Sequence, residues 1–138
     1  MRSLIIALII LLTGTVIYAA YSKSLSNTLT IIEQGGGGEN VSLEFYQDPG
    51  LTTPISSLAW GEMEAGDTGE KTFYIKNTGD PVSVSPSSNL SNQVGTVTVS
   101  LGSTTLNTGQ STNANVSLSI KNNAAVGSVS FSITITAQ

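Results

Sequence analysis

The sequence predicts a long hydrophobic N-terminal α-helix followed by an all-β head, an antiparallel sandwich of about seven strands. Three observations support this: an apolar N-terminal stretch, a run of four glycines after it, and alternating apolar and polar residues from there to the C-terminus. We therefore divide the chain into a helix at 1–34, a glycine hinge at 35–38 and a β-sandwich at 39–138.

The N-terminal stretch from Leu4 to Ala20 contains no charged residue, and its length is at the lower limit for a membrane-spanning helix. Arg2 precedes the stretch and Lys23 follows it. The positive-inside rule then favours an inner N-terminus and an outer head.

Three interpretations of this region compete. A secretory signal peptide would be cut near Ala19 or Ala20. A retained helix would run from about Ser3 to Gln34, because apolar residues recur every three or four positions in its second half. We favour the helix and expect it to be the assembly element. Its apolar residues are Leu4, Ile5, Ile6, Leu8, Ile9, Ile10, Leu11, Leu12, Val16, Ile17, Tyr21, Leu25, Leu29 and Ile32.

The third interpretation is a β-strand within residues 21–32, since Leu25, Leu29 and Ile31 also alternate with Ser and Thr. Such a strand could be donated to the sheet of a neighbouring subunit. Asn27 interrupts its apolar face, so we rank the strand below the helix.

The run Gly35, Gly36, Gly37 and Gly38 predicts a hinge, because glycine adopts many backbone conformations. A phosphate-binding loop is a poor match, since no Lys-Ser or Lys-Thr pair follows the glycines.

The head contains six clear strand patterns separated by turn-forming residues. A further strand is expected within Leu51–Trp60. Trp60, the only tryptophan, is expected to fill the core between the sheets. The inward sets are Val41, Leu43 and Phe45; Phe73 and Ile75; Val82 and Val84; Val97, Val99 and Leu101; Val116, Leu118 and Ile120; and Val129, Phe131, Ile133 and Ile135.

The composition argues against an enzyme and against a cofactor or metal. The chain has no Cys and no His, which removes thiol nucleophiles, imidazole bases and the commonest transition-metal ligands. Glu62, Glu64 and Asp67 lie close together but match no calcium-binding loop, so we interpret them as a solvated acidic turn. Beyond residue 34 the chain has three lysines and eight acidic residues, so this part carries a net negative charge. Nucleic acid is therefore not an expected partner.

Asn40, Asn89 and Asn115 each begin an Asn-x-Ser triplet, the acceptor for N-linked glycans in exported proteins. We expect at least one of them to carry a sugar.

Several segments of the head resemble the immunoglobulin-like repeats of archaeal exported proteins. They are Trp60-Gly61, Ala65-Gly66, Phe73 to Gly79, and Leu106 to Gly109. The resemblance covers nearly all of the head and implies an immunoglobulin-like antiparallel sandwich.

The whole layout, a hydrophobic helix joined through glycines to a Ser/Thr-rich β head, is similar to that of archaeal type IV pilins and archaellins. The resemblance implies an extracellular, surface-attaching filament that is a homopolymer built on the helices, with each subunit in the membrane before assembly. Two alternatives stay open: a filament joined by donor strands from residues 21–32, and a membrane-anchored or secreted binding module.

Overall fold

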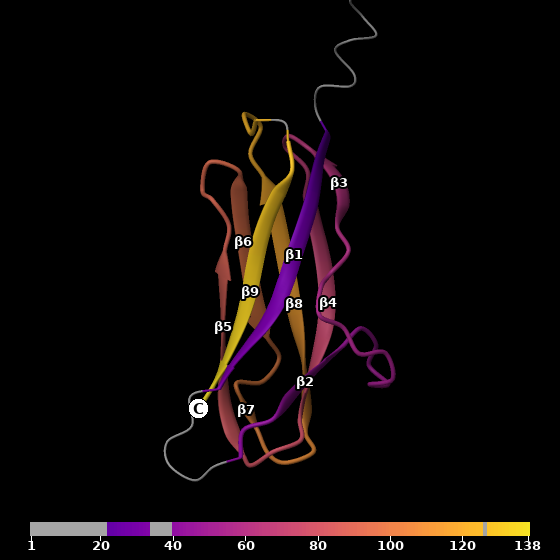
Figure 1. Ribbon diagram of the computed structural model, residues 1–138, viewed down its shortest axis with the longest axis vertical. Coiled ribbons are helices and arrows are strands. Elements are labelled where there is room, and N and C mark those ends of the chain that lie inside the picture. Colours follow the sequence, from indigo (N-terminus) through magenta and orange to yellow (C-terminus); the bar gives the residue numbers. More distant parts are fainter. Residues whose placement is uncertain (1–21, 34–39, 126) are drawn as a thin grey trace, which may run out of the picture.

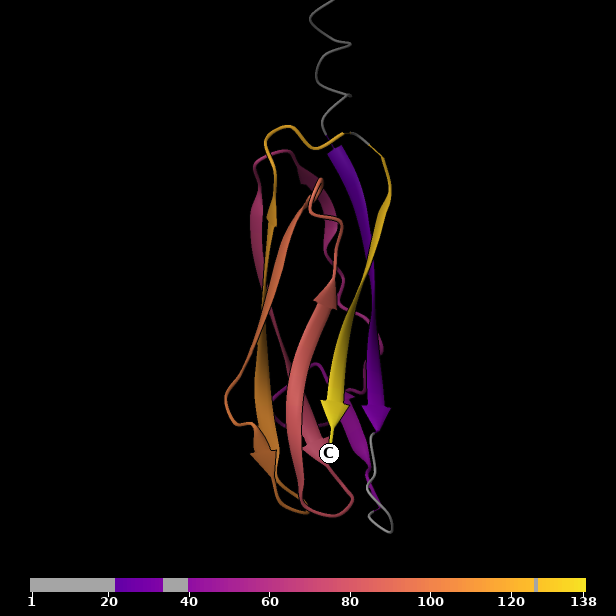
Figure 2. The same ribbon diagram turned by 90° about the vertical axis from the view of Figure 1, so that its left-hand side faces the viewer.

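The computed structural model describes residues 22–33, 40–125 and 127–138. Within these residues the protein is all-β, with nine strands in two stacked layers (Figures 1 and 2) and no helix. The strands are β1 (Ser22–Glu33), β2 (Leu43–Tyr46), β3 (Gly61–Glu64), β4 (Thr68–Asn77), β5 (Val82–Asn89), β6 (Gly95–Leu101), β7 (Thr105–Leu106), β8 (Ser111–Ile120) and β9 (Val129–Ala137).

One layer is a five-stranded sheet in the order β3-β1-β9-β5-β7, and the other is a four-stranded sheet in the order β2-β4-β8-β6. Neighbouring strands are antiparallel except β1 and β9, which run parallel along the length of the sandwich (Figure 1). The N-terminal strand of the described region is therefore paired with the C-terminal one.

The predicted alternation produces the core between the layers. Along β8, for example, Ala114, Val116, Leu118 and Ile120 are buried, while Asn115 and Ser117 between them are exposed. The same period-two pattern places one face of β4, β5 and β9 inward. The most deeply buried large apolar side chains are Phe73, Ile75, Leu106, Val116, Leu118, Ile133 and Ile135.

The predicted helix is wrong for residues 22–33, which form β1. Leu25, Leu29 and Ile32, expected on an assembly helix, are instead paired with β9 residues in a strand ladder. Its second half contains two Thr and two Ile, which favour strands, and β3 and β9 supply backbone partners that sequence spacing does not show. The assembly residues from Leu4 to Tyr21 and the predicted hinge Gly35–Gly38 lie outside the described residues.

In the part of the chain that the structure describes, we find no helical segment that could span a bilayer. The six strands expected in the head are all present, as β2, β4, β5, β6, β8 and β9. The prediction of about seven strands is wrong, because β1, β3 and β7 also belong to the two sheets and the described residues form nine strands.

The further strand predicted within Leu51–Trp60 is also wrong. This segment is a loop that touches the sheet at one isolated bridge, Tyr46 with Pro54. The carboxylate of Asp48 holds the loop, because it accepts hydrogen bonds from the N–H groups of Thr52 and Thr53. These local bonds to a side chain replace the bonds that a neighbouring strand would make.

Candidate functional site

The position of β1 within the five-stranded sheet is the structural feature most relevant to the predicted assembly of subunits into a filament. β1 lies between β3 and β9, so these two strands are not neighbours of each other. β1 pairs with β3 through Ser22–Leu25 and with β9 through Leu25–Glu33, so the two ladders meet at Leu25. Without β1, the edge of β9 would be open and β3 would have no place in the sheet.

Two ladders hold β1. Its first four residues pair antiparallel with β3, from Ser22 with Glu64 to Leu25 with Gly61. From Leu25 to Glu33 it pairs parallel with β9, ending at Ala137. The long parallel ladder therefore holds most of the strand, and β3 holds only its beginning.

The alternating set Leu25, Leu29 and Ile31 is in register with the apolar residues Val129, Ile133 and Ile135 of β9. Asn27, the residue that counted against a strand, is in register with the buried Phe131. The strand prediction for this segment therefore agrees with the observed pairing, and the helix prediction does not.

The chain is held firmly where the described part resumes after β1. The N–H of Asn40 donates to the carboxylate of Asp80 at 2.8 Å, and the N–H of Asp80 donates to the carbonyl of Asn40 at 2.9 Å. A side chain at Gly79 would overlap the backbone of Asn40, so only glycine fits there. Only residues 34–39 separate this fixed point from β1, and four of these six residues are glycine.

The three glycan acceptors lie in different surroundings, although all three are exposed. Asn40 precedes β2 and lies outside any strand. Asn89 is the last residue of β5. Asn115 lies in the middle of β8, and its side-chain oxygen accepts a hydrogen bond of 2.9 Å from the hydroxyl of Thr72 on β4.

The other candidate residues form no reactive site. In the part of the chain that the structure describes, no group of acidic side chains is placed to hold a metal ion. Glu64 and Asp67 instead close a turn, in which the N–H of Glu64 donates to the carboxylate of Asp67 at 2.8 Å. Trp60 is half-buried, and its ring packs against Phe131 with 6.3 Å between centroids.

Sequence reasoning missed the slot that β1 occupies. β3 and β9 lie far from β1 along the chain, and neither contains a local pattern that identifies it as the neighbour of residues 22–33. Comparison of the chain with protein-family models and with curated proteins finds no match.

Proposed function

We propose that the protein is a structural subunit of an extracellular filament, in which β1 of one subunit fills the slot between β3 and β9 of the next. One observation carries the proposal: β1 is paired between β3 and β9, and only residues 34–39 separate it from Asn40, where the chain is fixed to Asp80. An inserted element on a short glycine-rich connection is suited to exchange between identical chains.

The exchange costs little in contact energy, because it keeps the same contacts. The β1–β9 and β1–β3 ladders contain the same hydrogen bonds whether β1 belongs to the same chain or to a neighbour. Six residues extend over at most about 20 Å, which limits the exchange to an adjacent subunit. Donation from each subunit to the next is a head-to-tail contact, and such contacts form open filaments when the rotation between subunits does not close a ring.

The sequence is consistent with a location outside the cell. The uncharged stretch 4–20 would hold the chain in the membrane before assembly, and the acceptors Asn40 and Asn89 would be available for glycans. Attachment to surfaces is the role proposed for the filament.

Engineered disulfides test the exchange directly, because the chain has no cysteine of its own. Ser24 of β1 is in register with Glu62 of β3, so S24C and E62C bring two thiols together. If strands are exchanged, oxidised filaments of the S24C/E62C variant will produce a ladder of covalent oligomers on a non-reducing gel. A chain with S24C alone, assembled with a chain carrying E62C alone, will give linked dimers.

The control pairs S24C with T98C, since Thr98 belongs to β6 of the other sheet. This pair should produce no ladder. If S24C/E62C produces only a monomer with an internal disulfide, β1 stays in its own chain and the strand-exchange proposal is wrong. A membrane-anchored binding module would then be the better account.

A further inference from the structure

The outer face of the four-stranded sheet is mostly polar, and it carries the charged side chains of Glu44, Glu70 and Lys76. We call it the polar face and define it by Tyr46, Tyr74, Asn113, Asn115, Ser100 and Thr98. They alternate with buried residues of β2, β4 and β8 and with half-buried residues of β6, so their side chains share the side away from the core. The polar face belongs to the sheet that does not contain β1.

Register places these side chains in rows across the sheet. Tyr46 is opposite Tyr74, and Tyr74 is opposite Asn113. In the next row Thr72 is opposite Asn115, and Asn115 is opposite Ser100. Two neighbouring tyrosines are therefore continuous with a series of amide and hydroxyl groups.

Both tyrosine rings are half-buried. The two ring–ring contacts found among the described residues join Phe45 to Phe73 and Trp60 to Phe131, so neither Tyr46 nor Tyr74 takes part. The exposed part of each ring can therefore contact a ligand, although the hydroxyl of Tyr46 already donates to the carboxylate of Glu44. Tyrosine is well suited to this role, because it combines an apolar ring with a polar hydroxyl.

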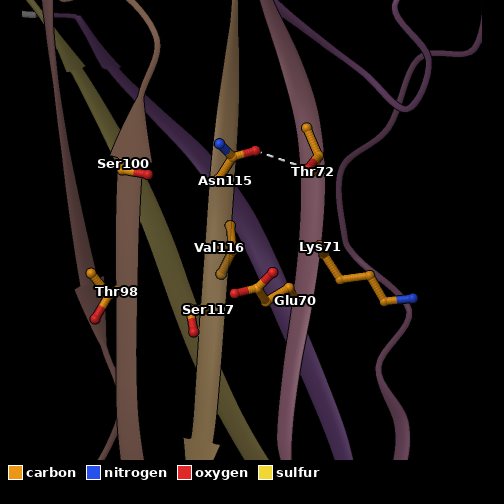
Figure 3. A pocket seen from close by; sticks show the side chains of 8 residues that line it. All are labelled: Glu70, Lys71, Thr72, Thr98, Ser100, Asn115, Val116 and Ser117. Carbon is orange, nitrogen blue, oxygen red and sulfur yellow. Dashed lines mark hydrogen bonds between the residues drawn. The ribbon is translucent and has the colours of Figure 1, made fainter.

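Two shallow hollows follow one another along β8 on this face. One, of about 400 Å³, surrounds Asn115 and includes Thr98 and Ser100 (Figure 3). The other, of about 500 Å³, lies beside Tyr74 and Asn113. From Ser111 to Ser117 the strand extends about 20 Å, which is long enough for several sugar units in a row.

The chemistry of the polar face favours an uncharged ligand rich in hydroxyl groups. Ser, Thr and Asn side chains each donate and accept hydrogen bonds, as sugar hydroxyls do. Thr98, Ser100 and Ser117 have no side-chain partner on this face among the described residues, so these groups are available to a ligand.

Other ligand classes fit less well. Lys71 borders the hollow, but its side chain is directed away from the other residues in Figure 3, whereas Glu70 faces the hollow. The hollow therefore offers no cluster of cations for a phosphate or a nucleic acid. Added peptide strands bind at sheet edges, where backbone groups are free, and not on a sheet face.

We propose that the polar face binds a neutral polysaccharide chain, with sugar rings on Tyr46 and Tyr74 and sugar hydroxyls bonded along β8. Many weak contacts of this kind give modest affinity per site, and a filament would multiply them by presenting the face many times.

The test uses the full-length protein, produced in a bacterium without N-glycosylation so that Asn115 is unmodified, and kept in detergent. Calorimetry would measure its affinity for the neutral hexasaccharides of glucose, mannose and N-acetylglucosamine, with a hexamer of galacturonate as the acidic comparison. Binding of at least one neutral hexasaccharide, and weaker binding of the acidic one, is the expected result. No binding of any neutral hexasaccharide would overturn the proposal.

Variants locate the site. Tyr74→Ala should weaken binding by about tenfold, and the double variant Thr98→Ala/Ser100→Ala by severalfold. The matched control is Ser85→Ala/Ser87→Ala on β5 of the other sheet, where both serines are exposed and affinity should change by less than about twofold. Thermal unfolding of each variant checks that it folds. The Thr98→Ala/Ser100→Ala variant keeps both tyrosines, so it tests the hydroxyl groups separately from the rings.

Two outcomes would assign the face differently. If the control variant weakens binding as much as Tyr74→Ala does, the sugar binds elsewhere and the proposal is wrong. If the polar-face variants change self-association in sedimentation experiments but not sugar binding, the face is a contact between copies of the chain. Neither outcome affects the disulfide test of strand exchange.

Discussion

The side-chain amide of Asn77 donates a hydrogen bond of 3.0 Å to the backbone carbonyl of Leu106. Asn77 ends β4 in the four-stranded sheet, and Leu106 belongs to β7 in the five-stranded sheet. The same amide donates to the carbonyl of Asp80 at 2.7 Å, and its oxygen accepts from the N–H of Gly79 at 3.0 Å. One fully buried polar side chain therefore links the two layers.

Replacing Asn77 by alanine should lower the free energy of unfolding by about 2–4 kcal/mol, because the carbonyl of Leu106 and the N–H of Gly79 lose their partner in a dry environment. Urea denaturation measures the change. Asn107→Ala is the matched control. Asn107, like Asn77, is the first residue of an Asn-Thr-Gly triplet, but it is exposed. We expect a cost below about 0.5 kcal/mol for the control, and equal costs would contradict this account of Asn77.

Asp48 predicts a dependence of the 48–53 loop on pH. Burial tends to raise the pKa of Asp48, but hydrogen bonds from Thr53 and Thr52 outweigh it and hold the pKa below its ordinary value of 3.8. A carboxylate with a lowered folded-state pKa stabilises the fold above its unfolded-state pKa. That contribution is lost as the pH falls through the lower folded-state value.

The stability difference between the wild type and Asp48→Asn should therefore be largest near neutral pH and should shrink toward about pH 2. Amide hydrogen exchange at Thr52 and Thr53 reports the loop itself, since both N–H groups bind the carboxylate. A difference that stays constant over the whole pH range would contradict the assigned role of the charge.

Tyr46 should titrate abnormally because of its neighbour Glu44. The tyrosine hydroxyl donates to the carboxylate of Glu44. This hydrogen bond, followed by burial and the nearby negative charge, raises the pKa of Tyr46 above 10.0. Glu44→Ala should move the pKa of Tyr46 back toward 10.0, as measured by NMR titration of labelled tyrosine. Glu70→Ala, on β4, should leave it unchanged, and a shift of equal size there would argue for a general charge effect.

Glycan occupancy should differ among the three acceptors. Asn115 is held between β4 and β6, paired with Thr72 and Ser100, so its backbone is fixed in a regular strand. Asn40 lies outside any strand, and Asn89 lies at the end of one. Peptide mass spectrometry of protein from the producing cells should therefore find sugars at Asn40 or Asn89 and an unmodified Asn115. A modified Asn115 would cover the polar face and contradict both this expectation and sugar binding there.

Much of the head could be predicted from its residues. Alternation in Val116, Leu118 and Ile120 identified β8, and turn residues such as those from Asn77 to Pro81 separated the strands. These features are local, because side chains on a strand alternate between its faces and turns need particular residues. The loop at Leu51–Trp60 was mistaken for a strand, because the hydrogen bonds of Asp48 are not visible as a pattern of apolar residues.

Residues 22–33 mark the limit of local reasoning. Leu25, Leu29 and Ile32 fit one side of a helix, while Leu25, Leu29 and Ile31 fit one side of a strand, so the segment is compatible with both. From the residues alone we predict that this segment has an apolar side, that glycines follow it and that a β-sandwich comes next. The segment is a strand because its backbone partners belong to β3 and β9, which are distant in sequence and therefore not visible as a local pattern. The same holds for the link from Asn77 to Leu106 and for the rows of the polar face, since each depends on strand register rather than on neighbours along the chain.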